Sequence, residues 1–187
     1  MTTTSLLNNE EKKFLLSLAR EVIQTTAGSK KFNQPKYFSE ILKKKLGVFV
    51  TLHKYGNLRG CIGYVEGIKP LQQAVQEMAM SAAFNDPRFP SVTAEEVDDI
   101  IIEISVLSPI KKINNTNEIE IGRHGLIIEN GLNKGLLLPQ VATEYYWDKK
   151  TFLEHTCRKA GLPDDAWQEK ETDIYIFSAE IFSEKEV

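Results

Sequence analysis

The sequence is poor in cysteine, has no excess of basic residues and has no long hydrophobic run, and each shortage excludes a class of protein. Cysteine occurs only twice, which rules out a fold held together by several disulfides. Lys and Arg total 23 against 26 Asp and Glu, and this balance argues against a dedicated nucleic-acid binder. No apolar run approaches the roughly 20 residues that span a bilayer. We therefore expect a protein that binds neither nucleic acid nor membrane.

The cysteines and the start of the chain bear on the compartment. Cys61 stands between glycines and Cys157 stands in a helical pattern, so the two thiols occupy dissimilar settings. Two reduced thiols are expected because disulfides are rare in the cytosol, with a single disulfide as the alternative. The segment Met1–Leu7 is too short and too polar for a signal peptide. These features predict a cytoplasmic location.

The chain length and composition predict an ordinary globular protein. A chain of 187 residues with 42% hydrophobic and 26% charged residues can bury a core that needs no stabilising disulfides or metal ions. We expect one domain over residues 1–187, with a small subdomain within about residues 111–140. The polar, asparagine-rich segment Lys111–Glu120 is interpreted as a loop or a subdomain boundary.

The hydrophobic periodicity predicts alternating helices and strands without regular βαβ spacing. A first helix is capped by Asn8 or Asn9 and ends at Gly28, and Thr93 opens a short helical turn. The other expected helices cover residues 39–45, 70–82 and 149–160, and the expected strands cover residues 48–53, 100–107, 126–129, 135–138 and 174–182. The expected strands at residues 126–129 and 135–138 form a hairpin. This pattern predicts the α+β class, with a mixed β-sheet flanked by helices and a smaller subdomain.

The first candidate site is the hexapeptide Leu58-Arg59-Gly60-Cys61-Ile62-Gly63, which we interpret as a glycine turn. Its glycines permit close backbone approaches, so that Cys61 can be presented beside amide groups that bind an anion. Arg59 supplies donors suited to carboxylate or phosphate, and a cation near a thiol favours the thiolate. In the alternative interpretation Cys61 is a small buried apolar residue. No Gly-Lys-Ser/Thr follows, so the hexapeptide is not a P-loop.

Two further segments carry residues that could take part in chemistry. The proline-stiffened loop from Asp86 to Pro90 presents Asp86, Arg88 and an aromatic ring, which can line a cleft. Alternatively, Asp86 and Arg88 form a local pair that pins the loop. His124 precedes a predicted hairpin strand, where an imidazole could act as a base. No cluster of His, Cys, Asp or Glu has metal-ligand spacing, so no metal or other cofactor is expected.

Three consecutive aromatic residues, Tyr145, Tyr146 and Trp147, follow residues 138–144. A stretch of this kind could stack on nucleotide bases if a basic stripe accompanied it. No such stripe is present, so we interpret the three rings as packing residues and surface anchors.

Four segments occur in the order found in the AMMECR-type domain family, which is named for a human gene from the chromosomal region of Alport syndrome with elliptocytosis. They are the hexapeptide, residues 86–89, residues 138–142 and residues 157–162. The resemblance extends from about Leu15 to Phe182 and covers the hexapeptide without departure. It implies a larger α/β domain with a smaller subdomain and a cleft near the hexapeptide. Some bacterial relatives occur beside Memo-like proteins and radical-SAM enzymes, which implies a partner of that kind.

The leading hypothesis is an enzyme or a ligand-activated protein with an anion-binding cleft around Cys61. The residues assigned to ligand binding are Arg59, Gly60, Gly63, Asp86 and Arg88, and those assigned to catalysis are Cys61 and His124. The ligand would be a small anionic molecule. The alternative is a non-catalytic protein-interaction module in which the hexapeptide shapes a binding surface.

Overall fold

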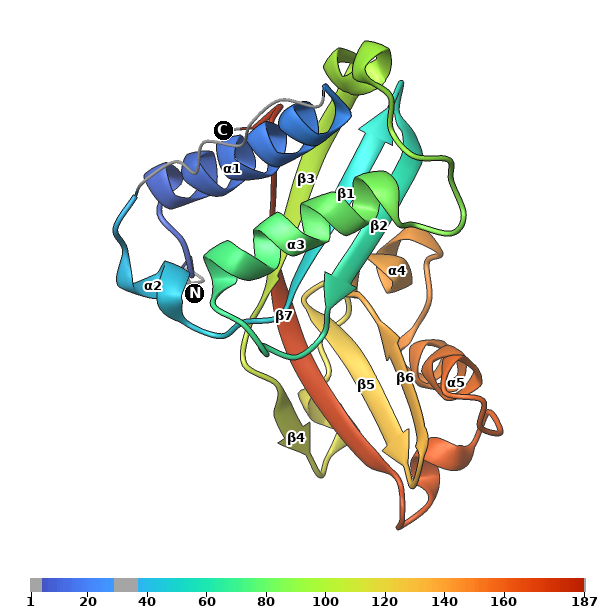
Figure 1. Cartoon of the computed structure of the whole chain (residues 1–187). Coiled ribbons are helices and arrows are strands. Elements are labelled where there is room, and N and C mark those ends of the chain that lie inside the picture. The colour runs from blue at the N-terminus through green and yellow to red at the C-terminus, as the bar shows by residue number, and fades with distance from the viewer. Residues whose placement is uncertain (1–4, 29–36, 187) are drawn as a thin grey trace. The chain divides into compact units, whose positions relative to one another are not determined.

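The computed structural model describes residues 5–28 and 37–186, which form parts of two compact units (Figure 1). The first unit comprises Met1–Leu107 and Glu180–Val187, and the second comprises Ser108–Ala179. The chain thus leaves the first unit once and returns to it at its C-terminal end. None of the helices in the described ranges is long and apolar enough to cross a membrane.

The first unit contains an antiparallel sheet in which β1 (Val48–Lys54) lies between β2 (Asn57–Tyr64) and β3 (Ile100–Leu107). β1 and β2 form a hairpin that turns at Tyr55 and Gly56, both of which have positive φ. The end of the chain runs along β3, where the amide of Glu184 donates to the carbonyl of Ile102 at 3.1 Å. β2 is therefore the edge strand of this sheet.

The helices α1 (Asn9–Ala27) and α3 (Leu71–Phe84) pack on one face of this sheet, with the short helices α2 (Glu40–Lys43) and η1 (Ala94–Asp99) beside them (Figure 1). Asn8 and Glu11 form a capping box that starts α1. Alternate residues of the strands point towards the helices and form the core. The strand residues of this core are Val48, Val50, Leu52, Ile100, Ile102, Ile104 and Val106.

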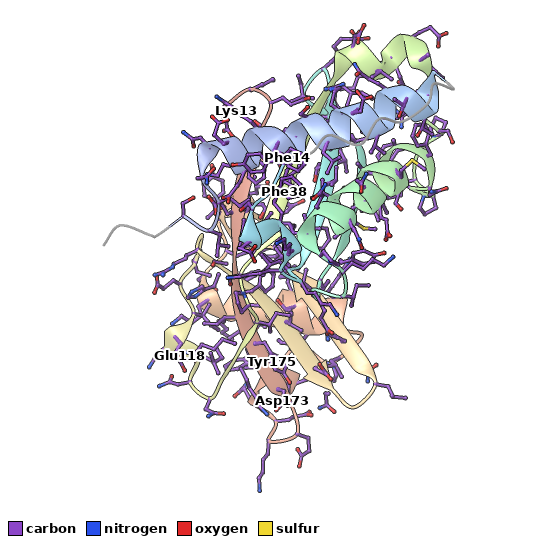
Figure 2. All side chains as sticks on the ribbon, turned by 60° about the vertical axis from the view of Figure 1, so that its left-hand side comes forward. Lys13, Phe14, Phe38, Glu118, Asp173 and Tyr175 are labelled. Carbon is purple, nitrogen blue, oxygen red and sulfur yellow. The ribbon has the colours of Figure 1, made fainter. Side chains whose placement is uncertain are left out.

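The second unit contains β4 (Lys111–Ile113), β5 (His124–Asn130), β6 (Asn133–Leu137) and most of β7 (Asp173–Ser183). β7 pairs with β4 and with β5, and β5 pairs with β6, always antiparallel. The helix α5 (Lys149–Lys159) packs on β5 and β6, and α4 (Pro139–Glu144), η2 (Thr116–Glu118) and η3 (Ala166–Gln168) complete the unit. Figure 2 shows Asp173 and Tyr175 on β7, where the tyrosine hydroxyl donates to the carboxylate at 3.3 Å.

The α+β class predicted from the sequence is confirmed. Ile100–Leu107 is an interior strand, and the face of α3 that begins at Leu71 packs in the core against its sheet. The strand pairings described above are all antiparallel, rather than of both directions, because hairpins and crossing segments connect the strands without βαβ units. The polar segment Lys111–Glu120, for which the sequence predicts a loop or a subdomain boundary, includes β4, whose residues pair with the apolar strand β7.

Candidate functional site

The hexapeptide is a strand, not the turn that its glycines suggested. It occupies β2, and the turn lies before it at Tyr55 and Gly56. A side chain at Gly60 would place its Cβ 2.2 Å from the carbonyl oxygen of Ala82 in α3. A Cβ at Gly63 would lie 2.3 Å from the ring of Phe49. The glycines therefore let β2 pack closely against its neighbours.

A β-bulge at Arg59 interrupts the pairing of β2 with β1. Leu52 pairs with Gly60, whereas His53 pairs with Leu58, so Arg59 is the extra residue. A bulge bends a strand and redirects the side chain of the inserted residue. The bulge therefore sets the direction of the Arg59 side chain, whereas Cys61, two residues further on, lies in the regular register of the strand.

The backbone of Cys61 is held on the outer side of the edge strand by the loop after α3. Its amide donates to Oδ2 of Asp86 at 2.9 Å, and its carbonyl accepts from Nη2 of Arg88 at 3.1 Å. Arg88 also donates to Asp86 through Nε at 3.0 Å and Nη2 at 2.8 Å. We call this arrangement the Asp86–Arg88 clasp. It satisfies two backbone groups that an edge strand otherwise leaves unpaired.

The two members of the clasp differ in exposure and therefore in what they can do. The side chain of Asp86 is 1% exposed, whereas that of Arg88 is 53% exposed. The Arg88 guanidinium, together with the amides of Cys61 and Arg88, holds the pKa of Asp86 well below its usual range despite its burial. Asp86 is thus a fixed carboxylate that only accepts hydrogen bonds, and it is not a proton donor at neutral pH.

The thiol of Cys61 contacts a hydroxyl on the neighbouring strand. Thr51 of β1 pairs directly with Cys61, and its Oγ1 lies 3.3 Å from Sγ of Cys61. Cys61 is partly exposed, whereas Cys157 in α5 is fully buried. Burial raises the pKa of the Cys157 thiol. Of the two cysteines, Cys61 is the one with exposed surface.

Arg59 binds Glu96 of η1 and not the thiol of Cys61. Its Nη2 lies 2.5 Å from Oε1 of Glu96, and Nζ of Lys54 lies 2.9 Å from Oε2. Burial of Glu96 opposes its charge, but the hydrogen bonds from Arg59, Lys54 and the Thr93 amide outweigh burial and lower its pKa to about 2. The Phe89 ring lies 6.0 Å from the Arg59 guanidinium and 5.5 Å from that of Arg88.

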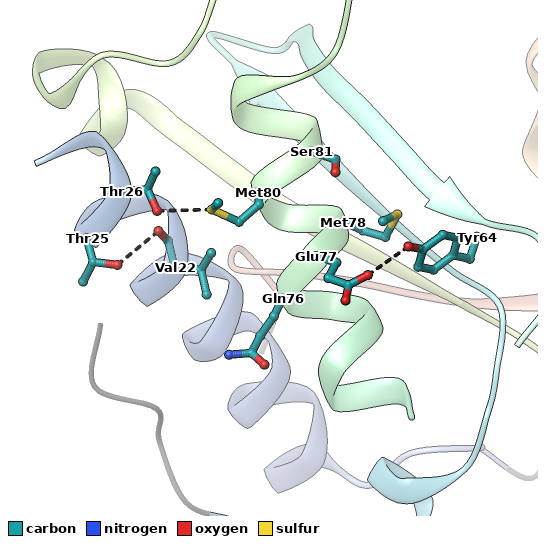
Figure 3. Close-up of a pocket in the computed structure, with 9 residues that line it drawn as sticks. All are labelled: Val22, Thr25, Thr26, Tyr64, Gln76, Glu77, Met78, Met80 and Ser81. Atoms are coloured by element: carbon teal, nitrogen blue, oxygen red, sulfur yellow. Dashed lines mark hydrogen bonds between the residues drawn. The ribbon is translucent and has the colours of Figure 1, made fainter. Parts of the chain in front are cut away.

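Described residues of the first unit line concavities in two places. One, of about 450 Å³, borders the Arg59–Glu96 pair and also presents Lys54 and Thr93. The other, of about 530 Å³, lies between α1 and α3 (Figure 3). Some of its polar groups bind one another: the Tyr64 hydroxyl donates to Glu77 at 2.9 Å, and the Thr26 hydroxyl contacts the Met80 sulfur at 3.2 Å.

His124, assigned to catalysis from the sequence, belongs to the second unit, where it begins β5. Its Nδ1 accepts a hydrogen bond from the amide of Glu120 at 3.1 Å. Burial lowers the pKa of His124, which favours the neutral imidazole. Within the described ranges, no group of three or more His, Cys, Asp or Glu side chains is placed to hold a metal ion.

Three residues near the site were not assigned from the sequence. Thr51 faces Cys61, and Glu96 holds Arg59 while its Oε1 also accepts from the Thr93 amide of the predicted capping box. Nε2 of His53 is buried, has no hydrogen-bond partner among the described residues and lies 3.9 Å from Oε2 of Glu103. Strand alternation places Thr51 and His53 on one face, but the pairing that brings Cys61 to Thr51 cannot be read from a single strand.

The comparisons with known proteins agree over nearly the whole chain. The AMMECR1 family profile matches residues 16–182. A protein from Methanothermobacter thermautotrophicus is 48% identical over 95% of this chain and 96% of its own. Protein MJ0810 from Methanocaldococcus jannaschii is 49% identical over 97% and 94%. The crystal structure of the uncharacterized protein PH0010 from Pyrococcus horikoshii has a TM-score of 0.88 at 43% identity, covering 97% of this chain and 95% of that one. The chain is a member of the AMMECR1 family.

Proposed function

We propose that Cys61 is a reactive thiol beside an anion-binding site, and that the protein is an enzyme or a ligand-activated protein for small carboxylates or phosphates. The observation that supports this proposal most directly is the position of Arg88. Its guanidinium is hydrogen-bonded to the carbonyl of Cys61 and is half-exposed. Among the residues that the structure describes, its Nη1 has no hydrogen-bond partner, so one edge of the cation is open to a ligand.

The remaining contacts fit a preorganised site. The clasp fixes the backbone of Cys61, and the Thr51 hydroxyl lies against the sulfur, so little reordering precedes a reaction at Sγ. An anion on Arg88 would lie next to the residue that carries the thiol. A carboxylate or phosphate is the expected ligand because the planar guanidinium matches both groups. In this proposal Cys61 is the nucleophile, Arg88 binds the anion and Asp86 positions Arg88.

Two alkylating reagents of similar size test both parts of the proposal. Iodoacetate is an anion and iodoacetamide is neutral, so an anion site beside Cys61 favours iodoacetate. We expect native Cys61 to react with both while Cys157 does not, and the iodoacetate-to-iodoacetamide rate ratio to exceed that of the unfolded chain. The Arg88→Gln variant should lose this excess, and Arg88→Lys should keep part of it because the charge remains. If both thiols are equally protected from alkylation in the native protein, Cys61 is not a nucleophile.

A second candidate function is a non-catalytic protein-interaction module in which the hexapeptide shapes a binding surface. Its support is that both arginines near Cys61 are already paired with acids of the same unit, Arg88 with Asp86 and Arg59 with Glu96. The family resemblance suggests a Memo-like or radical-SAM protein as the partner. In this case the Arg88→Gln variant would keep the iodoacetate-to-iodoacetamide rate ratio of the unchanged protein. The same variant would lose binding to such a partner, measured by calorimetry. The Cys61→Ser variant would then bind normally.

A further inference from the structure

In the second unit, α4 ends with a bulky residue where helices usually have glycine. The amide of Trp147 donates to the carbonyl of Ala142 at 2.8 Å, and the amide of Tyr146 donates to that of Thr143 at 3.3 Å. This pair of bonds is a Schellman motif, which requires a left-handed residue after the helix cap. That residue is Tyr146, with φ 53°. A side chain with a Cβ is strained in this conformation.

The next helix shows the same motif with the usual residue. At the end of α5, the amide of Leu162 donates to Cys157 at 3.0 Å, and the amide of Gly161 donates to Arg158 at 3.0 Å. Gly161 has φ 75° and takes the place that Tyr146 takes after α4. The fold therefore tolerates glycine at such a position, and the strain at Tyr146 comes from the side chain it carries.

Contacts with the described residues do not compensate this strain. Tyr146 is 95% exposed, and within the described ranges its hydroxyl has no hydrogen-bond partner. Tyr55, the other tyrosine with positive φ, donates its hydroxyl to Asp99 at 2.6 Å and lies under Lys54. Strained residues that persist cluster at active sites, ligand clamps and switch regions. The contrast indicates that the contacts of Tyr146 are made with another molecule.

The neighbouring rings extend the exposed tyrosine into an aromatic surface. Tyr145 stacks on Trp147 with centroids 5.1 Å apart, and Trp147 stacks on His155 at 3.8 Å. Tyr145 is 64% exposed. The stack immobilises Trp147 and Tyr145, so a partner that docks here loses little of their conformational entropy. We call Tyr145, Tyr146 and Trp147 the aromatic surface.

The charges beside the aromatic surface indicate what it binds. Glu144 and Asp148 flank the three rings, and the stretch from Glu144 to Asp148 contains no basic residue. The nearby basic residues belong to α5: Lys149, Lys150, which lies 3.7 Å from Glu154, and Arg158, which pairs with Asp164 and has its Nη1 3.4 Å from Nε2 of His155. Aromatic faces attract cations, arginine most often, and nearby carboxylates add to that attraction. We propose that the aromatic surface is a docking site for an arginine-bearing segment of a protein partner.

Binding of a short glycine-rich peptide with two arginines, measured by fluorescence anisotropy, tests the proposal directly. A peptide with citrulline in place of both arginines keeps the shape and removes the charge. We expect the arginine peptide to bind at least about fivefold more tightly than the citrulline peptide, since two cation–π contacts at exposed sites each contribute about two- to fivefold. Tyr145→Ala combined with Tyr146→Gly should abolish this preference, and Glu144→Gln should reduce it.

Stability provides the matched control. Tyr146→Gly alone should raise the melting temperature by about 2–4 °C, because glycine relieves the strain, while weakening binding of the arginine peptide. Gly161→Ala, at the equivalent position of α5, should lower it. Equal affinity for the arginine and citrulline peptides, or arginine binding that survives the double tyrosine change, would overturn the proposal. So would a lower melting temperature in Tyr146→Gly, because it would show that the chain itself uses this side chain.

Discussion

The hydroxyl of Thr51 lies 3.3 Å from the sulfur of Cys61, and the two residues face each other across neighbouring antiparallel strands. The contact gives the thiol a defined polar neighbour on the sheet, while the clasp fixes its backbone from the other side. The position of the Cys61 thiol in β2 thus depends on Thr51 in β1. A substitution at Thr51 should therefore change the reactivity of Cys61.

Thr51→Val removes this hydroxyl and keeps the volume and the β-branched shape. We expect the alkylation rate of Cys61 by iodoacetamide to fall by about fivefold, since a hydrogen bond of this kind contributes about 1 kcal/mol. The melting temperature should change little. Thr51→Ser, which restores the hydroxyl, is the control and should recover the rate. A Thr51→Val rate equal to that of the unchanged protein would show that the contact has no influence on the thiol.

Asp86→Asn should destabilise the protein by about 1–3 kcal/mol, because it weakens charge-assisted hydrogen bonds to Arg88 and to the Cys61 amide at a buried position. The free energy of unfolding in urea measures the change. Asp98→Asn is the matched control, since Asp98 is exposed, and its effect should stay within about 0.5 kcal/mol. Equal effects of the two substitutions would show that the clasp does not contribute to the free energy of unfolding.

Gly60→Ala should cost at least about 2 kcal/mol, because its Cβ would meet the backbone of α3 and the strand would have to move. Gly131→Ala provides the comparison: it has φ 60° and open space around it, so only backbone strain of about 1 kcal/mol applies. Chemical denaturation distinguishes the two. A smaller loss at Gly60 than at Gly131 would contradict the close approach of β2 to α3.

The lowered pKa of Glu96 predicts a dependence of stability on acid. Its folded pKa, about 2, lies below its ordinary value of 4.5, so its contribution is complete above pH 4.5 and is lost as the pH falls towards 2. Glu96→Gln should therefore flatten the stability profile between about pH 5 and pH 2. Exposed Glu171→Gln is the control and should leave the profile unchanged. Urea midpoints across this range measure both.

The parts of the fold that could be predicted depend on neighbours in sequence. Asn8 and Gly28 mark the ends of α1 by local hydrogen bonds, and the hairpin between β5 and β6 turns where its Asn-Gly signal lies. The pair between Asp86 and Arg88, one of two interpretations of that loop, spans only two residues. Such features follow from propensity and spacing alone.

The candidate site was harder to predict because its contacts span distant parts of the chain. Glycines are typical of turns, so the sequence predicts a turn at the hexapeptide. The reason for Gly60 is the backbone of α3, more than 20 residues further along. Arg59 was expected beside the thiol, yet it binds Glu96, which lies 37 residues away in sequence. The partner of Cys61 across the sheet depends on strand register, which a bulge at Arg59 shifts by one residue.

The division of the chain has a consequence for its synthesis. The second unit is a single continuous segment, so all of its residues leave the ribosome before residue 180. The first unit needs the last residues of the chain: Phe182 lies in its core, and Glu184 binds Arg20 at 2.5 Å and the amide of Ile102 at 2.8 Å. Most of the first unit is made before the second unit, yet the first unit is completed only after it. Until residues 182–184 have been made, the core of the first unit lacks Phe182, and the apolar residues that would pack against it are exposed in a nascent chain that a chaperone could bind.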